Sequence, residues 1–383
     1  MKILFLAPHP FFAERGTPIA VRLALEALSR QGHTIDLLTY HEGVDIDVPN
    51  MRIVRIARPP GVSNVPIGFS AKKLICDIWL AVSAYRLIFS KRYDVVHAVE
   101  EAVFIALVAR PFRKFRLVYD MDSLMSDQIA EKWPKAGPLL PVLHWFERLA
   151  MRRADLVLPV CEAIAQRARE ATSPEKVHLL PDVAFAAPET PTAAEDLRSI
   201  CTASGPLALY VGNLEGYQGV GLLIDAMEAV PPTKRCNLIV IGGTPDMVEE
   251  HRAVAAAKGL ERHVHFLGHR SIEHLGDYLR QADILCSPRL KGVNTPMKIY
   301  SYMAAGKAIL ATDIASHSQV LDASCAMLVQ PDAKAMAHGF EQLIEDTSLR
   351  DALGAASAKR AGDEYSLAAF EGRIKRAYAT ISA

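Results

Sequence analysis

The stretch NTPMKIYSYMAAGKAILATD, residues 294–313, decides how this chain folds. Thr295 is a suitable N-cap, Pro296 fits the first position of a helix, and Gly306 fits the position just after a helix end. The apolar residues 308–312 that follow form a typical buried strand. The stretch therefore predicts a helix of about ten residues whose unpaired N–H groups face outward at its start.

The cations near this helix start indicate an anion. Lys298 falls in the first turn, where it opposes the helix dipole unless a negative group is bound. Arg289 and Lys291 lie just upstream and favour the same phosphate-like ligand, although solvated surface charge remains the alternative. Ser301, one turn later, either reaches a ligand hydroxyl or bonds back to a helix carbonyl.

Strands and helices alternate on both sides of this stretch. Further strands are predicted at 2–7, 34–40, 51–57, 93–99, 115–121, 154–160, 207–213, 237–243, 264–269 and 282–288, with helices between them. Such alternation predicts parallel sheets covered by helices on both faces. A polar connector near 188–200 separates two sets of similar size, and 383 residues suit two domains.

Composition narrows the class of protein. The formal net charge is zero, which argues against a nucleic-acid binder. The six cysteines show neither paired nor zinc-like spacing, as expected for reduced thiols in a cytoplasmic protein. The N-terminal run MKILFLAPHP is too short for a secretory signal, and the apolar segment 74–89 is too short to span a bilayer. We expect a soluble protein, in the cytoplasm or at the cytoplasmic face of a membrane.

Several motifs together resemble one family. PMKIYSYMAAGKAILATD is similar to the donor-binding segment of family 4-type glycosyltransferases, which have the GT-B fold. Segments ERGTPIAVRLALEALSRQGHTIDLLT, YDVVHAVEE, RRADLVLPVCEAI, LYVGNLEGYQGVGLLIDAM and VHFLGHRS resemble other parts of that family in the same order. The resemblance implies an α/β protein with two Rossmann-like domains facing across a cleft: residues 1–187 on the acceptor side, 188–365 on the donor side, and a C-terminal helix in 366–383 that crosses back.

The resemblance also implies a reaction. A sugar passes from a nucleotide diphospho-sugar to an acceptor hydroxyl of a glycan, polysaccharide precursor or lipid-linked molecule, with retention of configuration. No metal or other cofactor is implied, because helix dipoles and basic residues neutralise the leaving diphosphate. The string DMD at 120–122 resembles the metal-binding motif of the other major glycosyltransferase fold, so a metal site there is the alternative.

Family positions transfer to this chain residue by residue. Catalytic roles fall on Asp122, Lys298 and Arg289, with a capping role as the alternative for Asp122. The residues implied to hold the donor are Arg15, Gly16, Thr17, Gly212, Asn213, Gln218, His269, Arg270, Lys291, Asn294, Thr295, Pro296, Met297 and Ser301.

The chain departs from the family pattern at four places. Ser301 stands where a ribose-binding glutamate is usual, and no glutamate precedes it in the loop RLKGVNTP. Asn213 and Gln218 replace a basic pair, which weakens this loop as a diphosphate site unless Arg289, Lys291 and Lys298 compensate. A histidine expected in the first domain is missing, which leaves Asp122 near the reacting centre.

His97 and Glu100 are expected on the acceptor side, although a core position is the alternative for His97. The first half is mildly basic, with 24 Lys and Arg against 20 Asp and Glu in residues 1–186. The basic segments 71–73, 90–92, 110–116 and 151–153 accompany apolar stretches, which suits either peripheral contact with an anionic membrane or ordinary surface charge.

Two other functions remain open. The missing glutamates and Gln218 also suit a nucleotide-sugar-binding protein without transferase activity, and a GT-B-shaped sugar-nucleotide epimerase is a further alternative. A nicotinamide-dependent dehydrogenase is disfavoured, because no GxGxxG motif follows the first strand.

Overall fold

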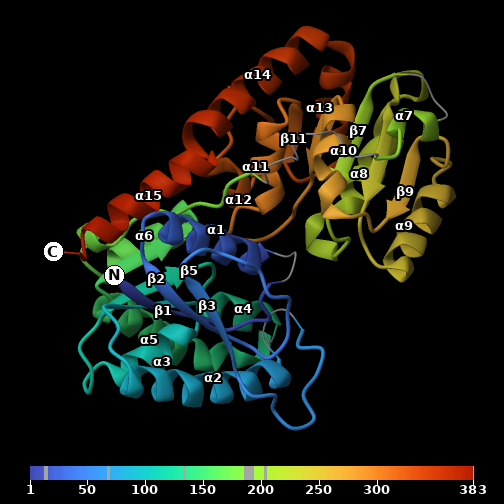
Figure 1. The fold of residues 1–383 in the computed structure, drawn as a ribbon. Helices are drawn as coiled ribbons and strands as arrows, with labels where there is room; N and C mark the ends of the chain where they lie inside the picture. Colours follow the sequence, from blue (N-terminus) through green and yellow to red (C-terminus); the bar gives the residue numbers. More distant parts are fainter. Residues whose placement is uncertain (13–15, 67–69, 133, 185–193, 202–204, 383) are drawn as a thin grey trace. The chain divides into compact units, whose positions relative to one another are not determined.

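In a computed structural model the chain divides into two compact units (Figure 1). Unit 1 comprises Met1–Pro181 with Phe370–Ala383, and unit 2 comprises Asp182–Ala369. The structure describes residues 1–12, 16–66, 70–132, 134–184, 194–201 and 205–382. The predicted boundaries at 187 and 365 lie a few residues from those of the two units.

Unit 1 is a parallel sheet covered by helices. Its strands are β1 (Lys2–Ala7), β2 (Thr34–Thr39), β3 (Met51–Arg55), β4 (Val95–Val99), β5 (Arg116–Met121) and β6 (Leu156–Pro159). Its helices are α1 (Gly16–Arg30), α2 (Ala71–Ser90), α3 (Ala102–Ala109), α4 (Met125–Lys132), α5 (Leu140–Arg153), α6 (Glu162–Ala171) and most of α15 (Leu367–Ala379). Helices α2, α3 and α5 lie on one face of the sheet, and α1, α6 and α15 lie on the other (Figure 1).

Unit 2 repeats this architecture. Its strands are β7 (Leu207–Val211), β8 (Asn237–Ile241), β9 (Val264–Gly268), β10 (Ile284–Ser287), β11 (Ala308–Thr312) and β12 (Met327–Val329). Its helices are α7 (Leu197–Ile200), α8 (Val220–Ala229), α9 (Pro245–Ala257), α10 (Leu275–Gln281), α11 (Met297–Ala304), α12 (Ala315–Ser318), α13 (Ala333–Glu345) and α14 (Thr347–Glu364), with a 3₁₀ turn at Gly216–Gln218.

The strand order places one switch point in each sheet. Unit 1 has the order β3-β2-β1-β4-β5-β6 and unit 2 the order β12-β11-β10-β7-β8-β9, with all strands parallel. The direction of winding reverses between β1 and β4, and between β7 and β10. Ligands of doubly wound sheets bind beyond the carboxyl ends of the strands at such points. The loops that follow these four strands are therefore the first place to look for a site.

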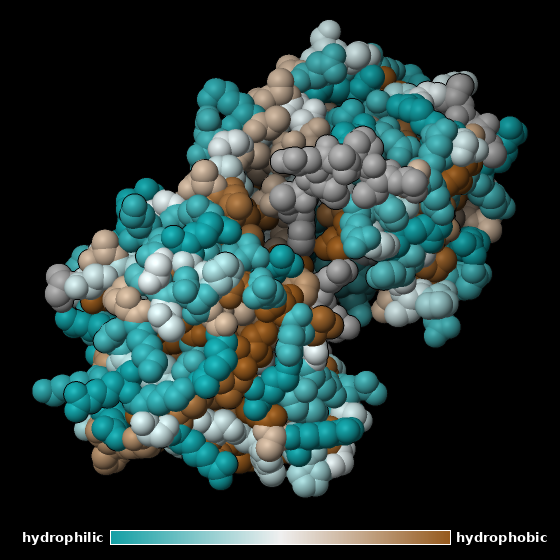
Figure 2. Space-filling model, in the orientation of Figure 1, coloured by the Kyte–Doolittle hydropathy of each residue, from teal (hydrophilic) through white to brown (hydrophobic). Residues whose placement is uncertain are grey.

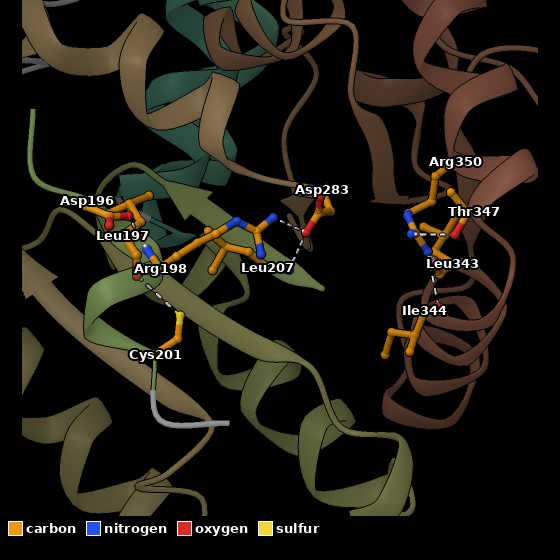
Figure 3. A network of polar contacts seen from close by, with 10 residues as sticks. All are labelled: Asp196, Leu197, Arg198, Cys201, Leu207, Asp283, Leu343, Ile344, Thr347 and Arg350. Carbon is orange, nitrogen blue, oxygen red and sulfur yellow. Dashed lines mark hydrogen bonds and ion pairs between the residues drawn. The ribbon is translucent and has the colours of Figure 1, made fainter. Parts of the chain in front are cut away.

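An aspartate ahead of a strand start fixes the register at the amino edge of each sheet. Asp283 accepts hydrogen bonds from the backbone N–H of Leu207 at 2.7 Å and from the Arg198 side chain at 2.8 Å (Figure 3). In unit 1, Asp155 accepts from the backbone N–H of Leu117 at 2.7 Å. Each carboxylate satisfies a donor that would otherwise be left unpaired at the strand start.

Alternating residues of the strands of unit 2 supply two apolar cores. Leu238 and Val240 of β8 pack in the layer that contains α8 and α13, whereas Ile239 and Ile241 pack in the layer of α10 and α11. The period of two that predicted buried strands thus places apolar side chains on both faces. The α/β class with two parallel sheets is confirmed.

The helix in the opening stretch begins one residue later than expected. Met297 is its first residue and Pro296, with extended backbone, takes the cap position that was predicted for Thr295. Proline at this position brings no N–H of its own, and the chain turns into the helix after it. Gly306 lies just past the helix with a φ of 66°, as predicted for the residue after its end.

Candidate functional site: a cationic cradle in unit 2

Two loops meet at the switch point of unit 2. The loop after β7 and the loop after β10 are joined by a hydrogen bond from Leu290 N to Tyr217 O at 2.8 Å. The Arg289 guanidinium lies 5.4 Å from the centre of the Tyr217 ring. Gly219, with a φ of 74°, permits the approach, since a Cβ there would lie 2.0 Å from Pro288 O. The two loops thus pack together as one floor beside the start of α11.

Lys298 projects from the first turn of α11 into this floor. Its Nζ lies 4.1 Å from the centre of the Tyr210 ring and donates a hydrogen bond to Gln218 Oε1 at 3.3 Å. Gly212 has a φ of 155°, which favours glycine, and a Cβ there would lie 2.4 Å from this nitrogen and displace it. Gly212, Gln218 and Lys298, predicted separately as donor-binding or catalytic residues, come together in the structure.

The environment of Lys298 favours an incoming anion. The residue as a whole is half-buried, but its ammonium end is surrounded by the β7 loop. This desolvation, with the nearby Arg289 charge as a second cause, lowers the pKa of Lys298 to about 7. Among the described residues, Lys298 has an amide and an aromatic ring as partners rather than a carboxylate. Its charge is therefore incompletely compensated, as at a site that binds a negative ligand.

Arg289 holds the loop that leads into α11. Its Nε donates to Lys291 O at 2.6 Å and its Nη1 donates to Asn294 O at 3.1 Å. The side chain of Lys291 is exposed. Thr295 is buried, and its hydroxyl has no hydrogen-bond partner among the described residues. A buried hydroxyl without a partner beside a helix N-terminus points to a ligand that supplies one.

His317 supports the floor from behind. Its Nδ1 donates to Thr312 O at 2.8 Å, and its Nε2 accepts from the Ser287 hydroxyl at 2.9 Å. Burial lowers the pKa of His317 to about 4, so the ring stays neutral and adds no charge to the site. Its place in the short helix α12, five residues after Thr312, is the sequence signal for this role.

Ser301 borders a cavity of about 740 Å³ on the α10, α11 and α14 side of unit 2. The carboxylate-bearing Glu273 also lines this cavity, together with Tyr365.

The other predicted donor residues of unit 2 lie in loops or at the start of α11. His269 is exposed in the loop after β9, and Arg270 pairs with Glu195 at 3.1 Å. Asn213 contributes a backbone carbonyl to the Tyr210 hydroxyl at 2.6 Å. Met297 is the first residue of α11, next to Lys298.

The described residues of unit 1 that were predicted for a site lie at the start of α1, in or just after β4, and just after β5. Gly16 and Thr17 open α1, so backbone N–H groups face the end of β1. Arg15 lies outside the described residues. Asp122 directly follows β5 and is half-buried. Beside it, the Ser123 hydroxyl donates to Glu100 Oε1 at 2.5 Å.

A buried charge cluster follows β4. Lys73 Nζ lies 2.6 Å from Glu101 Oε1 and 3.8 Å from Glu100 Oε2. Burial alone lowers the pKa of Lys73, but the two glutamates outweigh burial and raise it, so the lysine is charged. The prediction that residues 71–73 present surface charge is therefore wrong for Lys73, which points inward. Glu100 keeps its predicted place at the end of β4, with a φ of 47°.

His97 lies inside the core of unit 1 rather than at an acceptor surface. The ring has no exposed area and stacks on Phe5, with centroids 4.0 Å apart. Its Nε2 donates to Asp120 Oδ2 at 3.0 Å, so its Nδ1 accepts from the Tyr378 hydroxyl at 2.6 Å. In this structure the buried His97 ring is not positioned to contact an acceptor directly. The residue instead fixes α15 to the sheet.

Removing the Tyr378 hydroxyl should destabilise unit 1. The Tyr378→Phe change leaves His97 Nδ1 buried without a donor, at a cost of about 1–3 kcal/mol of unfolding free energy. Urea denaturation measures this cost. Tyr85→Phe, at a half-buried tyrosine on α2, is the control and should stay within about 0.5 kcal/mol. Equal stability of the two variants would show that the hydroxyl does not hold His97.

Metal-ligating side chains do not cluster in the part of the chain that the structure describes. No group of three or more His, Cys, Asp or Glu residues there is placed to hold a metal ion. Asp120, the first aspartate of the DMD string, accepts a hydrogen bond from His97. Of the described helices, none is both long and apolar enough to cross a bilayer.

Comparisons with known proteins agree with this geometry. Residues 15–182 match the family described as "Glycosyl transferase 4-like domain", and residues 205–346 match "Glycosyl transferases group 1". A phosphatidyl-myo-inositol mannosyltransferase from Mycobacterium leprae is 29% identical over 181 residues, which are 46% of this chain and 47% of that protein. The chain thus spans about half the length of this relative.

Two solved structures show the same fold over the whole chain. Sucrose-phosphate synthase from Thermosynechococcus elongatus has a TM-score of 0.79 at 21% identity, covering 99% of this chain and 98% of that one. Anabaena HepE in complex with UDP has a TM-score of 0.75 at 17% identity, covering 99% and 100%. With both family matches in chain order, this protein belongs to the family 4-type glycosyltransferases of the GT-B fold.

Proposed function

We propose that this protein transfers a sugar from a nucleotide diphospho-sugar to an acceptor hydroxyl, with retention of configuration and without a divalent metal. The observation that carries the proposal is the position of Lys298. Its ammonium lies at the start of α11, against Gly212 and Gln218, without a carboxylate partner among the described residues. A pyrophosphate bound there would receive backbone N–H groups, an ammonium and a guanidinium.

Lys298 offsets one of the departures from the family pattern. Asn213 and Gln218 bring no charge to the β7 loop, but Gln218 directs its amide oxygen to Lys298. The positive charge is supplied from α11 and Arg289 in place of the missing basic pair. Glu273, which lines the same cavity as Ser301, is our candidate for the ribose-binding carboxylate that the serine lacks.

In the proposed reaction, the bond between the anomeric carbon and the phosphate oxygen breaks while the acceptor oxygen attacks the same face of the sugar. Negative charge grows on the leaving pyrophosphate and is stabilised by Lys298, Arg289 and the α11 N-terminus. The leaving phosphate takes the acceptor proton, so no covalent intermediate on the protein is needed. Asp122 and Glu100 of unit 1 would orient hydroxyl groups of the acceptor.

The proposed acceptor is a polyhydroxylated glycan, a polysaccharide precursor or a lipid-linked molecule. The relative from Mycobacterium leprae is named for a phosphatidyl-myo-inositol acceptor, and the HepE structure contains UDP. We extend only the chemical class to this chain: a nucleotide sugar as donor and a hydroxyl-rich acceptor. A lipid-linked acceptor would bring unit 1 into peripheral contact with a membrane.

A thermal-shift screen tests the donor site and identifies the base. We expect one of UDP-, GDP-, ADP- and TDP-sugars to raise the melting temperature, because a ligand that binds the folded state stabilises it. A transfer assay with an acceptor panel follows, with the anomeric configuration of the product read by NMR. Undiminished transfer in EDTA supports metal independence. If no nucleotide sugar shifts the melting temperature, the proposal fails.

The departures at Ser301 and Gln218 favour one other function, nucleotide-sugar binding without transfer. In that case the donor raises the melting temperature, yet no acceptor is glycosylated. Isomerisation of the donor without an acceptor would instead reveal an epimerase.

A further inference from the structure

The outer surface of one helical layer in unit 1 carries an unusual number of apolar side chains. Fifteen large apolar residues are exposed in the described chain, and eleven of them lie in α2, in α3, between α3 and β5, or in α5 and the residue before it. We call this surface the α2–α3–α5 face, and its apolar members are Leu74, Ile75, Ile78, Val82, Phe89, Val108, Phe112, Leu139, Val142, Trp145 and Phe146.

Helix α2 shows why this face is more than scattered surface residues. Its inner stripe, with Cys76, Leu80 and Ala84, already fills the core of unit 1. A second apolar stripe, with Ile78 and Val82, points outward. A surface helix normally needs only one apolar stripe, so the second stripe is available for another partner.

The three helices bring these residues together. Helix α2 packs beside α3, and α3 packs beside α5, on the same side of the sheet (Figure 1). Phe104 and Phe146 meet edge to face across α3 and α5, with centroids 6.3 Å apart. Along α2, apolar residues alternate with hydrophilic ones at the surface (Figure 2). The face is therefore mixed in polarity, with apolar side chains interspersed among hydrophilic ones.

The exposed charge within the three helical segments that build this face is positive, and the exposed Asp94 lies just beyond the first of them. The exposed charged side chains of residues 71–92, 102–116 and 139–153 are Lys72, Arg86, Arg92, Arg113, Lys114, Arg116, Arg148, Arg152 and Arg153. The acidic residues within these segments turn inward: Asp77 binds Tyr40, and Glu147 accepts from Ser126. Beyond them, Asp94 binds Lys2 N and Asp155 binds Arg110. The exposed charge of these segments is thus cationic, and most of it lies at or just past the C-terminal ends of α2, α3 and α5.

We propose that the α2–α3–α5 face docks on the surface of an anionic lipid bilayer. An anionic bilayer surface favours apolar side chains that enter the interface together with Lys and Arg side chains that meet the lipid phosphates. A partner protein or a second copy of this chain would instead be expected to offer acidic residues to nine cations. The membrane's role as the source of a lipid-linked acceptor rests on the proposed function, whereas the docking itself does not.

Vesicle flotation tests the docking without donor or acceptor, so its failure is distinct from failure of the glycosyltransferase proposal. We expect the chain to float with phosphatidylglycerol–phosphatidylcholine vesicles, to float poorly with phosphatidylcholine alone, and to dissociate as salt rises. Ile78→Glu with Trp145→Glu, at two residues that are each 59% exposed, should lower the partition coefficient at least about tenfold.

Reversing the charge of exposed cations tests the docking proposal in a second, independent way. Lys114→Glu with Arg148→Glu removes two cations, and each should weaken binding to anionic vesicles about fivefold. The matched controls lie in unit 2: Val254→Glu, at an exposed valine of α9, and Lys334→Glu on α13. Both controls should float like the wild type, and all variants should keep the wild-type melting temperature.

Two results would overturn the docking proposal. One is equal flotation of the face variants and the unit 2 controls, or no flotation on anionic vesicles at all. The other is a dimer, seen by light scattering, that Trp145→Glu dissociates while vesicle binding is absent, because a second copy would then cover the face.

Discussion

Replacing Lys298 by methionine is expected to lower kcat/KM for sugar transfer by about 10²–10³-fold. Methionine keeps most of the side-chain volume beside Tyr210 and Gly212 but removes the ammonium. The leaving pyrophosphate then loses a preorganised charge in a desolvated position, where such a charge acts most strongly. Steady-state kinetics with the donor found by thermal shift measures the loss.

The stability of this variant separates chemistry from folding. A desolvated lysine without a carboxylate partner does not stabilise the free protein, so the melting temperature of Lys298→Met should match or exceed that of the wild type. Lys307→Met, just past the other end of α11, is the control and should transfer sugar at the wild-type rate. Wild-type kcat/KM in Lys298→Met would remove this residue from the proposed mechanism.

The elements around the site could be predicted because their signals are local. Period-two and unbroken apolar runs marked every strand of unit 1, and Pro296 and Gly306 bracketed α11. A helix cap depends on a few neighbouring residues, and the one-residue error at Pro296 has the same origin, since Thr295 and Pro296 are both suitable there. The elements that were not predicted are α4, α6, α7, α12, α13, α14 and β12.

What could not be predicted depends on contacts between distant residues. His97 ends a sequence pattern that suits a site residue, yet Tyr378, 281 positions later, binds it in the core. Lys73 stands in a basic segment, but Glu101 draws it inward. Sequence spacing cannot show such partners, because strand order decides which loops meet. For Lys298 the prediction and the structure agree on the position, and only the structure shows Tyr210 and Gln218 beside it.

Donor affinity should weaken as pH rises through neutrality. In the free protein Lys298 loses its proton near a pKa of about 7. A bound pyrophosphate places negative charge beside the ammonium and raises that pKa, so binding takes up a proton above pH 7. Between the two pKa values, Kd for the nucleotide sugar should rise about tenfold per pH unit. The pyrophosphate diester of the donor does not titrate in this range, so the slope reports on the protein.

Substitutions at one position isolate the group that titrates. Calorimetry from pH 6.5 to 8.5 should show the full slope in the wild type and in Lys307→Met. In Lys298→Arg the guanidinium stays charged, so Kd should be nearly independent of pH even if the longer side chain binds less tightly. In Lys298→Met, Kd should be weak and equally flat. A flat profile in the wild type would mean either that Lys298 remains charged in the free protein or that the pyrophosphate binds away from it, and the same slope in Lys298→Arg would assign the proton to another group.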